Sequence, residues 1–227
     1  MKKLILYTFL FSISFSTAQK KELRNANKFF TSGEYASAID LLDSSKEIFD
    51  SSDDKIKSQA MLLYGKLHTA MEDFELAMNA FDMSRSLGIS DQLLNPEISK
   101  LETDLITSAV GDNETENFSS AAKKLKMVYD LNKDNNEEYL FYAASSAVNS
   151  LDYPLALEYY EILRDIKYEG IENKFYITEV SSGNEIEINS ETEFKLLQKS
   201  KDYMNPREEE TESKFPEIVK NIALIYK

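Results

Sequence analysis

One spacing of apolar residues recurs along the chain: an aromatic residue, an alanine three positions later and a bulky apolar residue four positions after that. The instances are Tyr35–Ala38–Leu42, Phe74–Ala77–Phe81, Phe118–Ala121–Leu125 and Tyr153–Ala156–Tyr160. Residues three and four apart share one face of an α-helix, so each instance predicts a helix with an apolar stripe. The alanine lets a second helix approach closely. The recurrence therefore predicts stacked helical hairpins that share one continuous core.

A small residue also stands nine positions before each aromatic residue, on the helix expected to precede it: Ala26, Gly65, Ala109 and Ala144. The paired pattern resembles the tetratricopeptide repeat (TPR), in which an early small residue and a late alanine mark the crossing of helices A and B. The resemblance covers residues 20–168. It implies a solenoid of about four repeats, and such solenoids usually bind other proteins.

The helices predicted from this periodicity cover residues 20–31, 35–50, 54–70, 74–87, 96–111, 118–131, 136–150 and 154–167. The repeats are longer than the TPR unit of about 34 residues, and the surplus falls at Ser51–Asp54 and Leu87–Pro96. Gly88 is expected to end one helix, and Pro96 to stand near the start of the next.

The periodicity changes after Gly170. Lys174–Val180 and Glu185–Ile188 are typical of a β-hairpin, and a helix is expected over 191–203. A polar loop, Asn205–Ser213, should follow. The predicted fold is therefore all-α, a TPR-like helical-hairpin solenoid over 20–168 with a small β-hairpin and helix insertion over 169–214.

Residues 215–227 are expected to form the first helix of a fifth repeat. Val219, Ile222, Ala223 and Tyr226 repeat the spacing of residues 61, 64, 65 and 68. A single helix of about 12 residues with such an apolar face is marginal in water. We therefore expect either that the chain is truncated relative to a longer repeat protein or that it self-associates through this C-terminal helix.

Residues 1–19 have the composition of a secretory signal peptide. Lys2 and Lys3 precede an apolar run, and small residues lead to a predicted cleavage after Ala18 or Gln19. An uncleaved membrane anchor is the alternative, but the run is shorter than the ~20 residues that span a bilayer. The sequence predicts an exported bacterial protein, periplasmic or at the cell surface, with no membrane insertion after cleavage.

The chain is acidic, with a net charge of −14. Removal of residues 1–19 takes away two lysines and no acid, so the mature charge becomes −16. Such a chain is repelled by phosphate backbones, and nucleic acid is not an expected partner. The acidity is expected mainly to keep an elongated helical surface soluble, with a weaker bias toward basic partners.

No catalytic set, metal site or cofactor site is predicted. His68 is the only histidine and the chain has no cysteine, so zinc sites and nucleophilic triads lack their parts. His68 is expected to pack between helices. Glu208–Glu210 should be a solvated run, although a hydrolase that uses this region is a remote alternative. Asp130 begins a stretch like a calcium loop, but Asn135 and Phe141 stand where Gly and Glu are required.

The resemblance to TPR proteins nominates a partner-binding groove on the helix A positions. The residues carried over by register are Asn27, Phe30, Leu62, Lys66, Thr69, Ile106, Val110, Phe141, Ser145 and Asn149. Packing between repeats is the other interpretation of the same residues. Asn27 and Lys66 match only part of the carboxylate clamp of TPR co-chaperones, so a chaperone-tail ligand is not inferred. The predicted function is a non-enzymatic scaffold that binds a protein or peptide; the alternative is an accessory module of an envelope enzyme or transport complex.

Overall fold

The computed structural model describes residues 19–227, which form two compact units, one ending at Leu131 and the other spanning Asn132–Lys227. The predicted signal sequence lies almost entirely outside the described residues. None of the helices in residues 19–227 is long and apolar enough to cross a bilayer.

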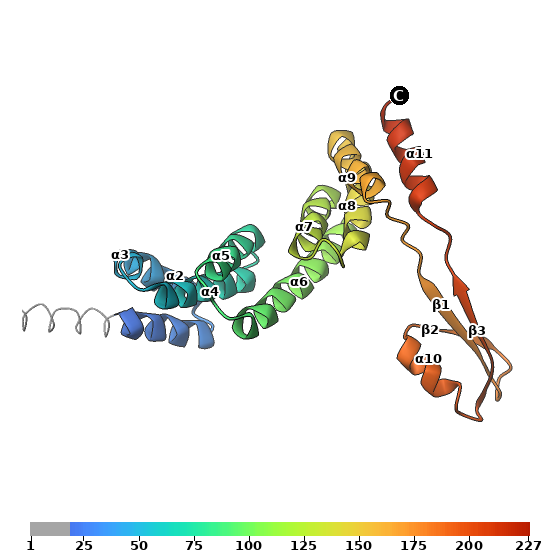
Figure 1. The fold of residues 1–227 in the computed structure, drawn as a ribbon, viewed down its shortest axis with the longest axis horizontal. Helices are drawn as coiled ribbons and strands as arrows, with labels where there is room; N and C mark the ends of the chain where they lie inside the picture. The colour runs from blue at the N-terminus through green and yellow to red at the C-terminus, as the bar shows by residue number, and fades with distance from the viewer. Residues whose placement is uncertain (1–18) are drawn as a thin grey trace, which may run out of the picture. The chain divides into compact units, whose positions relative to one another are not determined.

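The first unit consists of helices that pair with their neighbours in sequence (Figure 1). A helix over 19–31 is followed by α2 (Tyr35–Ser44), α3 (Lys46–Asp50), α4 (Asp54–Ala70), α5 (Phe74–Ser86), α6 (Asp91–Glu114) and α7 (Phe118–Leu131). The helix α4 packs along α5, and α6 along α7. These pairs confirm the predicted helical hairpins.

The predicted close crossing of paired helices is present. Ala77 is fully buried, and a Cβ atom added to Gly65 would lie 2.3 Å from the ring of Phe81. Only glycine allows the helices to meet at this distance. The other small residues of the pattern are equally buried, at 0% exposure: Ala26, Ala38, Ala109, Ala121, Ala144 and Ala156.

Two helix boundaries differ from those predicted. The helix expected over 35–50 is divided at Ser45, which is 5% exposed and lies between α2 and α3. The helix α6 begins at Asp91, so Pro96 lies inside it rather than near its start. Leu94 is fully buried, and its burial favours helix before Pro96 despite the hydrogen bond that proline cannot donate. Gly88 ends α5 as expected, with φ of +86°.

The second unit combines helices with a small sheet. Its elements are α8 (Glu137–Asn149), α9 (Tyr153–Asp165), β1 (Asn173–Glu179), β2 (Glu185–Ile188), α10 (Glu191–Leu197), β3 (Tyr203–Glu210) and α11 (Phe215–Ile225). The antiparallel sheet has the order β2-β1-β3. One face of the sheet is covered by α10, whose Phe194 is fully buried with Ile177 and Ile188.

The predicted all-α fold with a small β-hairpin is confirmed in part: the chain is mostly helical with paired helices, but the sheet has three strands rather than two. The segment predicted as a polar loop contains β3, and the helix expected to reach residue 203 ends at Leu197. The charged sequence of β3 has little strand propensity of its own. Its cross-strand contacts compensate: the Arg207 guanidinium lies 4.3 Å from the centre of the Tyr176 ring and 2.9 Å from a Glu185 oxygen.

The C-terminal helix α11 has a helical partner within its own chain. Ile218 and Ile222 are buried and α11 packs on α9, where Asn221 donates a hydrogen bond to the Tyr160 hydroxyl at 3.1 Å. Tyr226 and Val219 remain exposed. Truncation and self-association through this helix both stay predictions.

Candidate partner-binding groove

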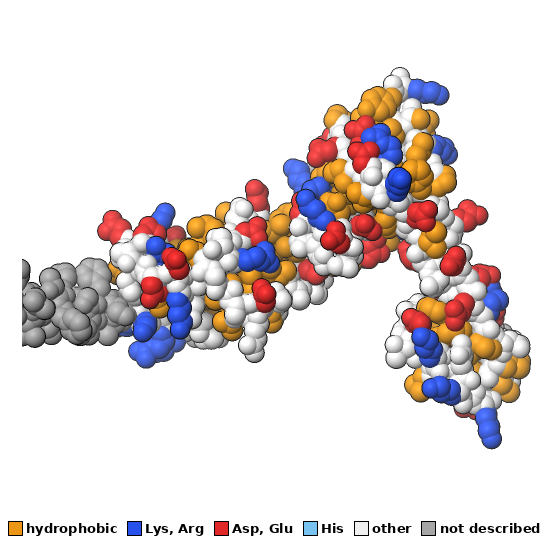
Figure 2. All heavy atoms as spheres, viewed as in Figure 1, with side chains coloured by type: hydrophobic (Ala, Val, Ile, Leu, Met, Phe, Trp, Pro, Cys, Tyr) orange, Lys and Arg blue, Asp and Glu red, His pale blue; other side chains and the backbone are white. Residues whose placement is uncertain are grey.

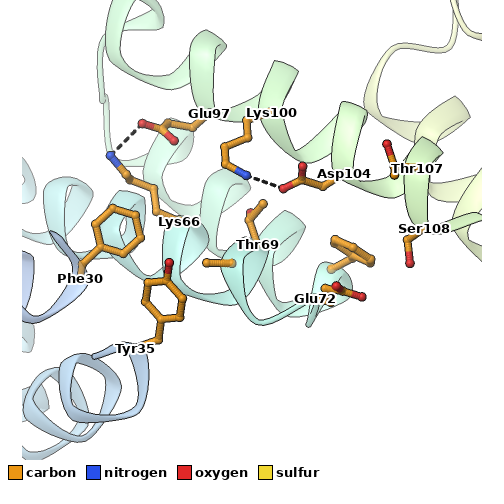
Figure 3. Close-up of a pocket in the computed structure, with 12 residues that line it drawn as sticks. Phe30, Tyr35, Lys66, Thr69, Glu72, Glu97, Lys100, Asp104, Thr107 and Ser108 are labelled. Atoms are coloured by element: carbon orange, nitrogen blue, oxygen red, sulfur yellow. Dashed lines mark hydrogen bonds and ion pairs between the residues drawn. The ribbon is translucent and has the colours of Figure 1, made fainter. Parts of the chain in front are cut away.

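The functional candidate in the first unit is a cavity of about 400 Å³ between the helix over 19–31, α2, α4 and α6 (Figure 3). The first helix and α2 contribute aromatic side chains, and α4 and α6 contribute mostly polar ones. Its lining consists of Phe30, Tyr35, Lys66, Thr69, Ala70, Glu72, Phe74, Glu97, Lys100, Asp104, Thr107 and Ser108.

Two ion pairs cross this cavity or border it. The Lys66 ammonium lies 2.8 Å from Glu97 and 5.1 Å from the centre of the Phe30 ring, so it joins three of these helices. Lys100 pairs with Asp104 at 2.5 Å along α6. About a quarter of the Lys66 and Glu97 side chains is exposed. Partly exposed pairs of this kind contribute little to stability and can exchange partners when a ligand arrives.

A second cavity, of about 300 Å³, continues from the first along the helix over 19–31 and α4. Each helix contributes residues at the spacing i, i+3, i+4 and i+7, which is one helical face. The lining residues are Lys20, Leu23, Arg24 and Asn27 from the first helix, and Gln59, Leu62, Leu63 and Lys66 from α4. Lys66 lines both cavities, which together are called the α4 groove below.

The α4 groove contains half of the site residues carried over from the TPR register. These are Asn27, Phe30, Leu62, Lys66 and Thr69. Thr69 is nevertheless 3% exposed, and its hydroxyl donates to the Gly65 carbonyl at 2.8 Å, so it forms the floor of the groove.

The two predicted residues of α6 do not line either cavity of the groove. Ile106 is half-buried and Val110 is 49% exposed. The same helix instead presents Glu97, Lys100, Asp104, Thr107 and Ser108. These residues lie within the helix predicted over 96–111, but the TPR register nominated only Ile106 and Val110 from it. Their polar spacing of three and four is a signal that the sequence carries.

The three predicted residues of α8 belong to the second unit and have different surroundings. Phe141 is 8% exposed and lies 6.4 Å, centre to centre, from the rings of Tyr160 and Tyr168. The Ser145 hydroxyl donates to the Phe141 carbonyl, and Asn149 is exposed at the helix end. Phe141 therefore has the surroundings of a core residue. Burial raises the pKa of Tyr168 to about 12, with acidic neighbours adding to the effect.

The end of the groove is fixed by a contact between α6 and α7. The Lys124 ammonium lies 2.6 Å from Asp112 and 2.8 Å from the Ser108 hydroxyl. Burial acts to raise the pKa of Asp112, but hydrogen bonds from Lys124 and Ser120 outweigh it and hold that pKa below its usual value. The carboxylate therefore stays ionised and keeps Lys124 beside Ser108.

His68 has the surroundings of a packing residue. Its ring stacks on Tyr64 with 6.2 Å between centres, and its Nδ1 atom lies 3.5 Å from an Asp73 oxygen without a hydrogen bond. It lines a separate cavity of about 450 Å³ between α2, α3, α4 and α5. Burial and the Asp43 carboxylate raise the pKa of Tyr64, whose hydroxyl donates to Asp43 at 2.6 Å.

The acidic stretch of β3 is exposed to solvent. Glu208–Glu210 are exposed on β3, and Glu209 pairs with Arg207. Among residues 19–227, no group of three or more histidine, cysteine or acidic side chains is arranged to hold a metal ion.

No model of a known protein family matches the chain, and no curated protein is significantly similar to it. The features that indicate a function are therefore the α4 groove and the repeated apolar spacing of the sequence.

Proposed function

We propose that this chain is a non-enzymatic, exported TPR-type protein that binds a segment of another protein in the α4 groove. Export is supported by the signal-like sequence of residues 1–19, and the TPR assignment by the repeated crossing residues. No cofactor is required for this function. The groove supplies the whole binding surface from helices whose crossings are tightly packed.

The observation that carries the proposal is the composition of the groove walls. Apolar surface from Phe30 and Leu62 alternates with charged side chains, and the ion pair of Lys66 with Glu97 remains partly exposed. A purely structural contact would bury the apolar groups and leave charges outside. Recognition surfaces combine apolar anchors with accessible polar groups on a rigid support.

Site-specific photocross-linking tests this proposal. A photoreactive amino acid replaces Thr107, which lines the groove, and in a matched variant it replaces Thr103. Both threonines are exposed on α6, one turn apart, and each hydroxyl donates to the carbonyl four residues earlier at 2.9 Å. The two positions therefore have the same local structure, but only Thr107 lines the groove.

We expect the Thr107 variant to cross-link a defined envelope protein in cells, identified by mass spectrometry, and the Thr103 variant to cross-link it much less. The purified partner should then bind the purified chain, and Phe30→Ala should weaken that binding. Equal cross-linking from both positions, or none from either, would contradict a partner-binding groove.

A further inference from the structure

The helix over 19–31 is basic in an otherwise acidic chain. It carries Lys20, Lys21, Arg24 and Lys28 against a single acid, Glu22, whereas the net charge of the chain is −14. Lys and Arg side chains gather over this helix in Figure 2. The net charge of this helix is therefore positive, whereas the net charge of the whole chain is negative.

Part of this basic charge lines the cavity between this helix and α4. Lys20 and Arg24 contribute from one wall and Lys66 from the other. None of the described residues that line this cavity is acidic. Within residues 19–227, Lys20 and Arg24 form no ion pair, and Lys66 alone is neutralised, by Glu97.

Apolar surface lies between these cations. Leu23 and Leu62 are half-buried, one on each wall, and Leu63 is 4% exposed beneath them. Asn27 and Gln59 add amide groups that can bind a peptide backbone. A ligand in this cavity would therefore meet an apolar floor with positive charge on both sides.

From this arrangement we propose that the partner segment bound in the cavity between the helix over 19–31 and α4 is acidic, with an apolar side chain flanked by Asp or Glu. The apolar side chain packs on Leu23 and Leu62, and the carboxylates pair with Arg24 and Lys66. The proposal rests on the proposed function and names the chemistry of its ligand. It reverses the expectation, drawn from net charge alone, of a basic partner.

The other cavity of the groove has a different charge balance. Glu72, Glu97 and Asp104 line it together with Lys66 and Lys100. Carboxylates of a ligand are therefore repelled from that cavity and attracted to the cavity of Lys20 and Arg24. This difference in charge decides which cavity of the groove an acidic segment occupies.

The probe is a short fluorescent peptide of Glu and Leu residues with both termini blocked, titrated against the purified full chain. Two control peptides replace every Glu by Lys or every Leu by Ser. We expect only the Glu–Leu peptide to bind measurably, with an affinity that falls as salt is added. Its binding should shift the NMR signals of Leu23 and Leu62.

Two charge-matched double variants locate the site. Lys20→Glu with Arg24→Glu reverses the cations of the cavity, whereas Lys21→Glu with Lys28→Glu makes the same charge change on the same helix outside it. The first variant should weaken binding about tenfold and the second about twofold or less. Circular dichroism of both variants should match that of the parent chain.

Equal weakening by the two double variants, or equal binding of the Lys–Leu peptide, would overturn the acidic-ligand assignment. The proposed function has a separate readout. Specific cross-linking through Thr107 without binding of the Glu–Leu peptide would refute the ligand chemistry and leave the groove's function standing. Failure of both experiments would remove both proposals.

Discussion

The helices α4 in the first unit and α8 in the second were both predicted to line a groove, with opposite results. On α4, Lys66 and Leu62 line an accessible groove. On α8, Phe141 is buried among aromatic rings, and the Lys214 ammonium lies 5.2 Å from its ring centre. Register alone therefore does not distinguish a binding surface from a core, because the neighbour that covers the helix decides between them.

The covering residues in the second unit come from far along the chain. Tyr168 follows α9, and Lys214 precedes α11 after the whole sheet. Lys214 is held there by a backbone hydrogen bond to the Glu169 carbonyl at 2.7 Å and by a 3.1 Å ion pair with Glu172. The segment that leads into and out of the sheet thus closes a surface that stays open on α4.

The largest expected effect separates the two phenylalanines at the corresponding surfaces. Phe141→Ala should lower the free energy of unfolding by about 3–5 kcal/mol, because it leaves a cavity among packed rings. Phe30→Ala should cost much less, because Phe30 is half-buried at the groove edge. Urea denaturation followed by circular dichroism measures both. Similar losses for the two variants would mean that the surfaces do not differ in this way.

A smaller effect tests the helix crossing on which the groove depends. Ala77→Leu should destabilise the chain by about 1–3 kcal/mol, because a fully buried crossing has no room for a larger side chain. Ala36→Leu, at an exposed position of α2, is the matched control and should change the thermal midpoint little. An unchanged midpoint for Ala77→Leu would show that the hairpin packing is wrong.

The ion pair across the groove should matter more for binding than for stability. Lys66→Met should change the free energy of unfolding by less than about 1 kcal/mol, because the pair with Glu97 is partly exposed. The same substitution should weaken binding of the Glu–Leu peptide several-fold. A large loss of helicity instead would indicate that Lys66 is a structural residue.

The smallest effect is a pH dependence at the end of the groove. The pKa of Asp112 is lower in the folded chain than its usual value of about 3.9, so its contribution to stability is present above that value. It is lost as pH falls through the folded pKa. Lys124→Met should reduce this acid sensitivity by less than about 1 kcal/mol, measured as unfolding free energies between neutral and acidic pH. An unchanged pH profile in Lys124→Met would contradict the role given to this pair.

Local sequence determined the elements whose stabilising contacts lie nearby in the chain. The helices α4 and α7 begin and end where their apolar periodicity predicts, and the strands β1 and β2 meet across a short turn. The alanine and glycine spacing also fixed which helices cross closely, since no larger residue fits between Gly65 and Phe81. For these features the elements and crossings expected from the sequence pattern agree with those in the structure.

Tertiary contacts decided what depends on residues distant in sequence. The charged segment Tyr203–Glu210 becomes a strand because β1 pairs with it, and α6 extends before Pro96 because Leu94 has a place in the core. The repeat pattern nominated Lys66 and Phe141 alike as groove residues. Only the fold brings Tyr168 and Lys214 over Phe141 and leaves Lys66 accessible, because burial is a property of all the neighbours a side chain meets and not of its own helix.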